Sequence, residues 1–437
     1  MRKTLTLAWL LAASVLFLVP GSGTSATAEP GPGYFATNNV QWLGNIPLNA
    51  DSAGARIVGN YLYVTEDRGL TIYDISDPEL PKPTGFHPLP QMPYYTEEDV
   101  DTNGKILLIG GYGPYTESSA QLNTLYVFDV TNKSLPRLVG QVAGGDAHTV
   151  SCVLDCTWAY NSDGGIIDLR DPANPKLAGN WDTGAGFSAN FSAHDVTEVS
   201  PGIVVTSSKP IYVLDARENP QQPKITLSAT PGDNRFIHGN LWPQGGTDKF
   251  LLVGGETGGD CNPTNSGAFM TFEKIVDPET QKVTRFQFRD QYRVPVDTGL
   301  PSDGQSPYNQ YCAHWFTTQP SYKDGGVVAA GWYEYGTRFL KVSPTDGEIT
   351  ELGWFLPLGG STSGAYWVND EILYAVDYQR GIDILRFTNQ PATGEVSVAG
   401  DPGLTIGSSA ALPPRYDGVR SKGMPYVCPI PRFARVA

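Results

Sequence analysis

Long apolar segments are missing from the sequence beyond its first 28 residues. No later run approaches the roughly 18 residues that a membrane-spanning helix needs. A sustained helical period is missing as well, so no long amphipathic helix is predicted there. These two absences exclude a helical membrane span and favour an all-β chain.

Basic residues are also scarce, with 30 Lys and Arg against 45 Asp and Glu. Nucleic acids and anionic membrane surfaces repel a chain with this excess of negative charge, so we predict neither as a partner. The sequence has no EF-hand, calcium nonapeptide repeat or phosphate-binding glycine loop. In the stretch from Gly360 to Gly364, threonine stands where a nucleophile elbow requires serine.

The first 28 residues have the pattern of a cleaved signal peptide. Arg2 and Lys3 precede a nearly apolar stretch from Leu5 to Val19, and Ala26-Thr27-Ala28 offers small residues for cleavage. Without the two basic residues, 28 basic side chains face 45 acidic ones, a net charge of −17. We expect the mature chain to begin near Glu29 and to be a soluble, secreted protein.

All five cysteines follow the expected cleavage point, in the part of the chain where export lets disulfides persist: Cys152, Cys156, Cys261, Cys312 and Cys428. Cys152 and Cys156 flank a tight turn between two strand-like runs, so we predict a local disulfide between them. Cys261 pairing with Cys312, or either with Cys428, would give a second bond. The odd number leaves one thiol over, and the sequence does not decide which.

A repeated unit organises most of the chain. Short β-branched and aromatic runs alternate with turns rich in Gly, Pro, Asn and Asp, which is the signal for strands and tight turns. One strand recurs seven times, 39 to 68 residues apart, anchored at Asp74, Asp129, Asp168, Asp215, Glu273, Lys341 and Arg386. This spacing fits four-stranded blades with loop insertions. We therefore predict an all-β, seven-bladed β-propeller, whose radial repetition avoids long exposed sheet edges.

The two ends of the repeat region predict how the ring closes. The segment from Val40 to Asn45 resembles an outer fourth strand, yet it precedes the first complete unit. We expect it to complete the last blade, so that an N-terminal strand closes the ring. The predicted organisation is a signal peptide at 1–28, the propeller at 29–400 and an irregular tail at 401–437, in a protein that we expect to be a monomer.

The units from Gly69 to Pro78 and from Thr124 to Val130 carry a family resemblance. With the glycines at Gly85 and Gly140, they resemble the LVIVD repeat of exported bacterial β-propellers. That resemblance implies the fold and no particular activity. The chain is more distantly similar to the selenium-binding protein and methanethiol oxidase propellers, which would imply copper and thiol oxidation.

Histidine is rare, yet four of the five histidines occupy one position of the repeat. Aligning the strand before each Ile/Val-rich run places one residue per unit at this position: Ala55, Glu98, His148, His194, His238, His314 and Ala365. The first strand of a propeller blade is innermost, so we predict that the four imidazoles converge on the central channel. Imidazole is the commonest protein ligand for transition metals, and we predict a site for Cu, Fe or Zn.

The residues beside the histidines leave alternatives open. Glu98 is a candidate ligand, a residue that orients a ligand, or a general acid or base, with a solvated carboxylate as the plain alternative. Asp195 points to the other face of its strand, which favours a turn cap or a backbone contact. Cys312 shares a face with His314, and we favour a disulfide over a soft metal ligand. The histidines themselves have an alternative role as packing and hydrogen-bonding residues.

Two functions from different classes fit these patterns. The first is a metal-dependent oxidoreductase that acts on a small-molecule substrate in the channel. The second is a non-catalytic scaffold that binds a protein or a glycan on one face. Aromatic loops such as Tyr112 to Tyr115 and Trp332 to Tyr335 would serve the second function.

Overall fold

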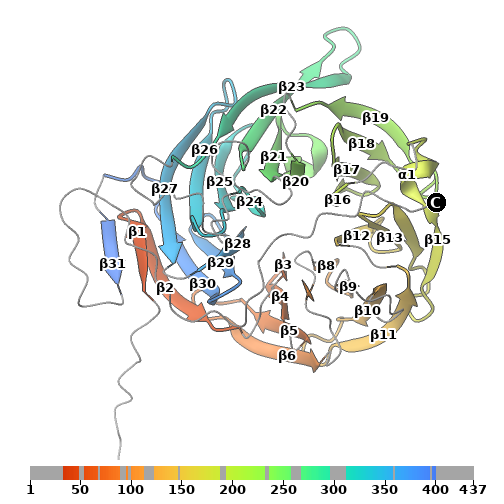
Figure 1. Cartoon of the computed structure of the whole chain (residues 1–437), viewed down its shortest axis with the longest axis horizontal. Coiled ribbons are helices and arrows are strands. Elements are labelled where there is room, and N and C mark those ends of the chain that lie inside the picture. The colour runs from red at the N-terminus through yellow and green to blue at the C-terminus, as the bar shows by residue number, and fades with distance from the viewer. Residues whose placement is uncertain are drawn as a thin grey trace, which may run out of the picture.

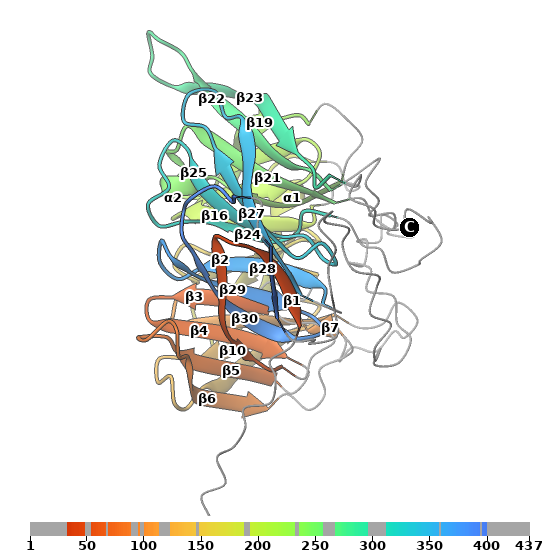
Figure 2. The ribbon, with the colours of Figure 1, turned by 90° about the vertical axis from the view of Figure 1, so that its left-hand side faces the viewer.

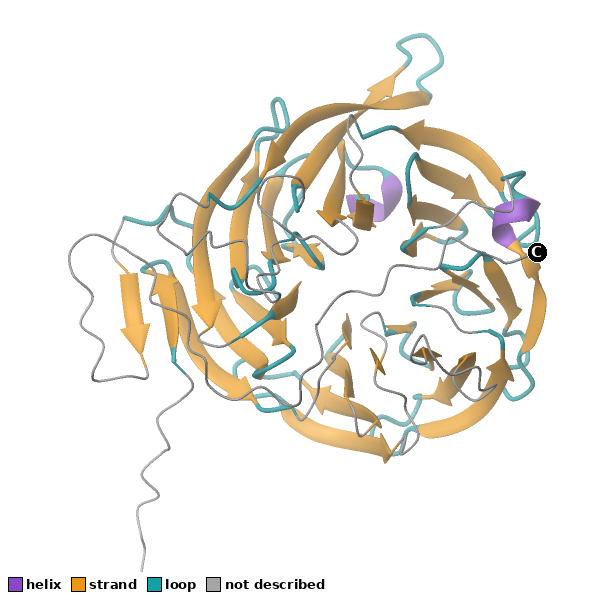
Figure 3. Ribbon diagram, in the orientation of Figure 1, coloured by secondary structure: helices purple, strands orange, loops and turns teal. Residues whose placement is uncertain are grey.

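The computed structural model describes residues 33–48, 54–66, 69–88, 95–96, 100–112, 123–145, 148–187, 193–231, 236–256, 267–295, 312–357, 360–393 and 396–399. These residues form seven sheets arranged side by side in a ring (Figure 1). Nearly all the regular structure is strand, and the helices in the described part are the single turns α1 (Trp181–Gly184) and α2 (Pro243–Gly246) (Figure 3). The predicted all-β seven-bladed propeller is confirmed.

The first four blades follow one another along the chain. Blade 1 consists of β3 (Gly54–Val58), β4 (Tyr61–Glu66), β5 (Gly69–Asp74) and β6 (Lys82–Pro88); blade 2 of β7 (Tyr95–Thr96), β8 (Asp101–Thr102), β9 (Ile106–Tyr112), β10 (Asn123–Asp129) and β11 (Arg137–Ala143); blade 3 of β12 (Val150–Val153), β13 (Trp158–Asn161), β14 (Gly165–Asp168) and β15 (Lys176–Asn180); blade 4 of β16 (Asp195–Ser200), β17 (Ile203–Ser207), β18 (Ile211–Asp215) and β19 (Lys224–Ala229).

Of the last three blades, blades 6 and 7 also contain strands from the N-terminal part of the chain. Blade 5 consists of β20 (Phe236–Leu241), β21 (Phe250–Glu256), β22 (Phe269–Val276) and β23 (Val283–Tyr292); blade 6 of β24 (Phe316–Thr318), β25 (Gly326–Gly331), β26 (Thr337–Val342), β27 (Ile349–Pro357), β1 (Tyr34–Thr37) and β31 (Val396–Ala399); blade 7 of β28 (Thr362–Trp367), β29 (Ile372–Asp377), β30 (Gly381–Phe387) and β2 (Val40–Ile46). The seven predicted anchors all lie on the third strand of a blade.

The ring closes through the N-terminal strand, as the sequence predicts. Strand β2 pairs antiparallel with β30, with Val40 opposite Phe387 and Ile46 opposite Ile382. Figure 2 shows the red N-terminal strands among the blue strands of the last two blades. Blade 7 is therefore built from both ends of the repeat region, which holds the first and last blades together.

Blade 6 carries two further strands that the sequence did not predict. Strand β1 pairs with the outer strand β27, and β31 pairs in turn with β1. The short connection between β1 and β2 explains this arrangement, because β2 is fixed at the edge of blade 7 and leaves β1 beside the edge of blade 6.

A buried polar cluster fastens the closing strand. The Asp383 carboxylate, on β30, accepts hydrogen bonds from Trp42 Nε1 (2.8 Å) and from the Asn45 side chain (3.1 Å). The same carboxylate pairs with Arg380 at 3.0 Å, and both charged side chains are at least 94% buried. A charge buried this deeply is stabilised only while its partners remain in place, so closure depends on this group.

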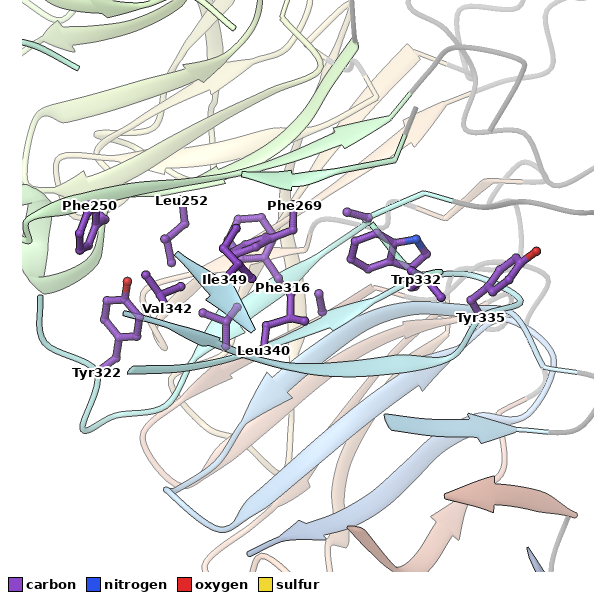
Figure 4. Close-up of a cluster of buried hydrophobic side chains, with 14 residues drawn as sticks. Phe250, Leu252, Phe269, Phe316, Tyr322, Trp332, Tyr335, Leu340, Val342 and Ile349 are labelled. Carbon is purple, nitrogen blue, oxygen red and sulfur yellow. The ribbon is translucent and has the colours of Figure 1, made fainter. Parts of the chain in front are cut away.

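Among the described residues, a hydrophobic cluster fills each of the seven boundaries between consecutive blades. Figure 4 shows the cluster between blades 5 and 6, where Phe250 and Phe269 face Phe316 and Leu340. Each sheet buries both faces in this way. In blade 1, for example, Leu62 and Val64 pack toward blade 7, whereas the intervening Tyr63 packs toward blade 2. Both faces being buried explains why the second strands are continuously apolar.

The glycine of each early repeat marks a close approach between blades. A Cβ atom on Gly85 would lie 2.0 Å from the Lys133 carbonyl oxygen, and one on Gly140 would lie 2.2 Å from the Pro172 carbonyl oxygen. The outer strand of one blade thus touches the turn that leaves the third strand of the next. Only glycine leaves room for that backbone contact.

The predicted hairpin disulfide is confirmed, because Cys152 and Cys156 are bonded across the turn between β12 and β13. Cys312 is also disulfide-bonded, which removes it as a metal ligand. Cys261 and Cys428 lie outside the described residues. In the described part of the chain, no helix is long and apolar enough to span a membrane.

The closure cluster gives a first testable prediction. Replacing Asp383 by alanine leaves Arg380 buried without its carboxylate partner and frees Trp42 and Asn45, so we expect the free energy of unfolding to fall by about 3–5 kcal/mol. The matched control is Glu218→Ala, which breaks a largely exposed ion pair with Lys224 and should cost less than about 1 kcal/mol. Denaturant unfolding followed by circular dichroism measures both. Equal effects of the two substitutions would contradict the role given to Asp383.

The recurring aspartate at the end of the third strand gives a second prediction. The pKa of Asp129 is lowered chiefly by the hydrogen bond from the Thr131 backbone, and those of Asp168 and Asp215 chiefly by the side chains of Arg170 and Arg217. Because the pKa of each aspartate is lower in the folded state, its charge adds stability when the pH is above the unfolded-state pKa near 4. This stability is lost as the pH falls through the folded-state pKa.

The triple variant Asp129→Asn/Asp168→Asn/Asp215→Asn should therefore lose less thermal stability than the wild type between about pH 4 and pH 2. The difference should shrink in 1 M salt, because these carboxylates are partly exposed and their arginine partners are exposed, so salt screens them. Parallel acid titrations of the melting temperature at low and high salt test this. Identical acid sensitivity of the variant and the wild type would show that other carboxylates govern the acid response.

Candidate metal centre

The four predicted histidines lie near the starts of the inner strands of blades 3 to 6. His194 immediately precedes β16, and His238 is in β20. His148 and His314 each lie two residues before the first residue of β12 and β24, respectively. In chain order, the exposed fractions of the four histidines are 6%, 1%, 0% and 0%. Because the inner strands surround the axis of the ring (Figure 1), one repeat position from four blades is brought together.

The imidazole rings form a continuous row. Ring centroids are 4.7 Å apart for His148 and His194, 4.0 Å for His194 and His238, and 3.9 Å for His238 and His314. The four side chains therefore lie one beside the next in a single row.

Backbone carbonyl groups of the neighbouring blade orient two of the rings. His194 Nδ1 lies 2.8 Å from the carbonyl oxygen of His238, and His314 Nδ1 lies 2.6 Å from that of Ser363. A carbonyl oxygen can only accept, so each Nδ1 carries the proton and the lone pair is on Nε2. The same arrangement orients many metal-binding histidines, because it fixes the tautomer and the ring direction.

Further hydrogen bonds hold the backbone at this position. The Thr149 hydroxyl donates to the His194 carbonyl oxygen at 2.7 Å, across the boundary between blades 3 and 4. The backbone N–H of His194 donates to Ser207, and that of His314 to Gly331. The row therefore rests on main-chain contacts between strands and between blades rather than on loops.

Burial keeps His238 uncharged. The pKa of His238 lies well below its usual value, first because burial disfavours the imidazolium ion and then because His194, His314 and His148 are nearby. A neutral imidazole is the form that binds a metal ion. The electrostatics of the site thus match the coordination chemistry that the sequence predicts.

A buried carboxylate that the sequence analysis missed completes the candidate site. Glu256 is the last residue of β21, opposite Phe236 at the start of β20, and is 3% exposed. One ligand atom each of His194, His238 and Glu256 lies within 4.8 Å of the other two. The signal in the sequence was a single charged residue at the end of the otherwise apolar run from Phe250 to Gly255.

The geometry favours a different ligand set from the four histidines that the sequence predicts. Within the described residues, the group that could hold a metal ion is two histidines and one glutamate. His148 and His314 lie at the two ends of the row, beside this group rather than in it, and the four-histidine set stays a prediction. The rings follow one another at tilted or edge-on angles, so the four imidazoles form a row.

The sequence alignment also misplaced two residues. Ala55 pairs with Val64, and Ala365 pairs with Ala375. In blade 4 the equivalent pair is Val196 with Thr206, so both alanines lie two residues beyond the histidine position. In blade 7 that position is Ser363, and in blade 1 it falls outside the described residues. A register shift between Thr362 and Gly364 explains why the sequence gave no clear alignment in blade 7.

The other candidate residues have the following positions. Glu98 lies outside the described residues and stays a prediction. Asp195 accepts hydrogen bonds from the Val196 backbone and the Thr197 hydroxyl, which confirms a local structural role.

In the aromatic loop, Trp332, Tyr333 and Tyr335 are at least 93% buried, so these three rings pack inside the protein instead of presenting a binding surface.

Trp315 borders the row on one side. Its ring centroid is 4.6 Å from that of His238 and 5.8 Å from that of His314. The ring also covers Gly239, where an added Cβ would lie 3.2 Å from it. The Trp315 ring therefore packs against one side of the candidate centre.

Comparison with known protein families identifies LVIVD repeats at residues 51–83 and 119–143. These segments fall in the first and second blades, where the sequence carries the repeat most clearly. No curated protein matches the sequence.

Comparison with solved structures finds other β-propellers. The β-propeller domain of Cps50 (Swd1) from Myceliophteria thermophila has a TM-score of 0.53 and 13% sequence identity, over 80% of this chain and 99% of that domain. YCF48 from Cyanidioschyzon merolae has a TM-score of 0.48 and 14% identity, over 79% of this chain and 98% of that chain. At these identities the first match supports the propeller fold and nothing more specific.

Proposed function

We propose that this protein is an exported β-propeller that binds a transition-metal ion near the axis of its ring, with His194 and His238 as ligands. The observation that carries the proposal is the row of buried imidazoles from consecutive blades. The hydrogen bond from His194 Nδ1 to the neighbouring blade fixes the direction of its ring, as in many metal-binding histidines. The acidic, disulfide-containing chain supports export.

Packing alone is a weaker explanation of the row. Apolar side chains would fill the same volume without the cost of removing polar ring nitrogens from water. All seven boundaries between blades are filled by apolar clusters of that kind away from the axis. A bound ion would instead use the nitrogen lone pairs and offset the cost of burying them.

The chemistry that fits the site is Lewis-acid or redox catalysis on a small molecule. Zn, Cu and non-haem Fe all accept imidazole ligands. The ligand atoms of His194, His238 and Glu256 lie within 4.8 Å of one another. Donors about 2.0–2.2 Å from one ion are about 3.4 Å apart, so each pair would need to approach by at most about 1.4 Å. We propose a metal-dependent oxidoreductase as the activity.

The proposal predicts near-stoichiometric Cu, Fe or Zn in protein purified without a histidine tag or chelator. The double variant His194→Ala/His238→Ala should lose the metal, because both nitrogen ligands are removed. His87→Ala is the matched control, since this fifth histidine lies on the outer strand β6 and its loss should leave the metal content unchanged. Elemental analysis of the three proteins measures the outcome.

A protein that holds no metal, even after reconstitution with each of the three ions, would overturn the metal-centre proposal. The histidine row would then be a packing feature of the ring, and the protein- or glycan-binding scaffold would become the better explanation. Circular dichroism of the variants confirms that the fold is retained in each comparison.

A further inference from the structure

We infer that Glu256 is the third ligand of this centre and that Tyr333 is the positioning residue that orients it. The inference rests on the proposed metal centre and goes beyond it by naming the carboxylate and its support. The evidence for it is a second repeat position, next to the histidine position. The residues at this position in blades 5 and 6 contact each other.

Glu256 and Tyr333 occupy the same place in consecutive blades. Phe250 pairs with the anchor Glu273 in blade 5, and Val327 pairs with the anchor Lys341 in blade 6. Glu256 and Tyr333 each follow the paired second-strand residue by six positions. Both therefore lie at the end of a second strand, beside the start of an inner strand where the histidines are.

The two side chains meet directly. The Tyr333 hydroxyl donates to Glu256 Oε1 at 2.7 Å, and both residues are buried. The Tyr333 ring also contacts the row itself, with its centroid 4.5 Å from that of His314. Tyr333 thus connects the carboxylate of blade 5 with the histidine of blade 6.

The backbone of Tyr333 is held in an unfavourable conformation. Its φ is +47°, a region that a bulky residue other than glycine rarely adopts. Reciprocal backbone hydrogen bonds with Thr362 of blade 7 keep it there, at 2.9 Å and 2.8 Å. A strained backbone conformation persists only where the surrounding contacts hold it. In this conformation the Tyr333 phenol is directed at Glu256.

The hydrogen bond decides how the carboxylate can bind. The phenol holds Oε1 and so fixes the direction of the carboxylate, which favours binding through one oxygen. The donor set is then two imidazole nitrogens and one carboxylate oxygen, all buried. Two histidines and one carboxylate with open positions hold non-haem Fe(II) and catalytic Zn, and the hard oxygen makes the set less suited to copper.

The test uses the full exported chain, stripped of metal and titrated anaerobically with Fe(II), and separately with Co(II) as a spectroscopic probe. Tyr333→Phe keeps the ring against His314 and removes only the hydroxyl. We expect a 10- to 100-fold weaker Fe(II) affinity, as for other residues that orient a ligand. The visible bands of bound Co(II) should also lose intensity, because an unrestrained Glu256 can bind through both oxygens and raise the coordination number.

Two further variants complete the comparison. Glu256→Gln keeps the shape of the side chain and removes the charged ligand, so Fe(II) affinity should fall by more than in Tyr333→Phe. Tyr322→Phe is the matched control, because Tyr322 is another tyrosine of blade 6, 1% exposed and outside the site. It should bind both ions like the wild type. If Glu256→Gln does not fold, Glu256→Asp retains the charge, shortens the reach and should weaken binding in the same direction.

The outcomes separate the two proposals. If Glu256→Gln and Tyr333→Phe bind Fe(II) like the wild type while His194→Ala/His238→Ala does not, this inference is wrong and the histidine centre stands. Loss of binding in Glu256→Gln, with unchanged affinity and Co(II) spectrum in Tyr333→Phe, would overturn the positioning role. No metal binding by the wild type would remove the proposed centre itself.

Discussion

The structure depends on the need of every blade for two neighbours. Each sheet is radial and buries both faces, and a hydrophobic cluster fills each of the seven boundaries between blades. A ring left open would expose an apolar face at each end, so closure is a condition of the fold. The chain meets it by placing β2 at the edge of blade 7, where buried Asp383 binds Trp42 and Asn45. Stability is thus concentrated at the boundaries between blades.

The candidate metal centre uses the same boundaries. Each contact that orients the row crosses from one blade to the next: Thr149 to the His194 carbonyl, His194 to the His238 carbonyl, and His314 to the Ser363 carbonyl. The packing that closes the ring therefore also sets the spacing of the imidazoles. A site built on inner strands in this way is preorganised, because its ligands are fixed by the scaffold before an ion arrives.

The sequence predicts what repeats, and it misses what does not. The seven anchors, the closing strand and the histidine row all follow from comparing one unit with another. Glu256 and Tyr333 escaped that comparison because their shared position holds different residues in different blades, and because the contact between them arises only when blades 5 and 6 pack. The pairing of β1 and β31 has no internal copy to compare with. The misplacement of Ala365 goes with a register irregularity between Thr362 and Gly364, just before it in the same strand.

Variation at two repeat positions is what turns a uniform ring into a one-sided site. The positions that pack between blades stay apolar all round, since each must fill the same kind of boundary. The position near the axis changes from histidine in blades 3 to 6 to Ser363 in blade 7, so the imidazoles gather on one side of the ring. The neighbouring position likewise changes from Glu256 in blade 5 to Tyr333 in blade 6, which places one carboxylate and one phenol against that row. Repetition thus supplies the convergence of side chains, and departures from repetition supply the mixed donors that a selective metal site requires.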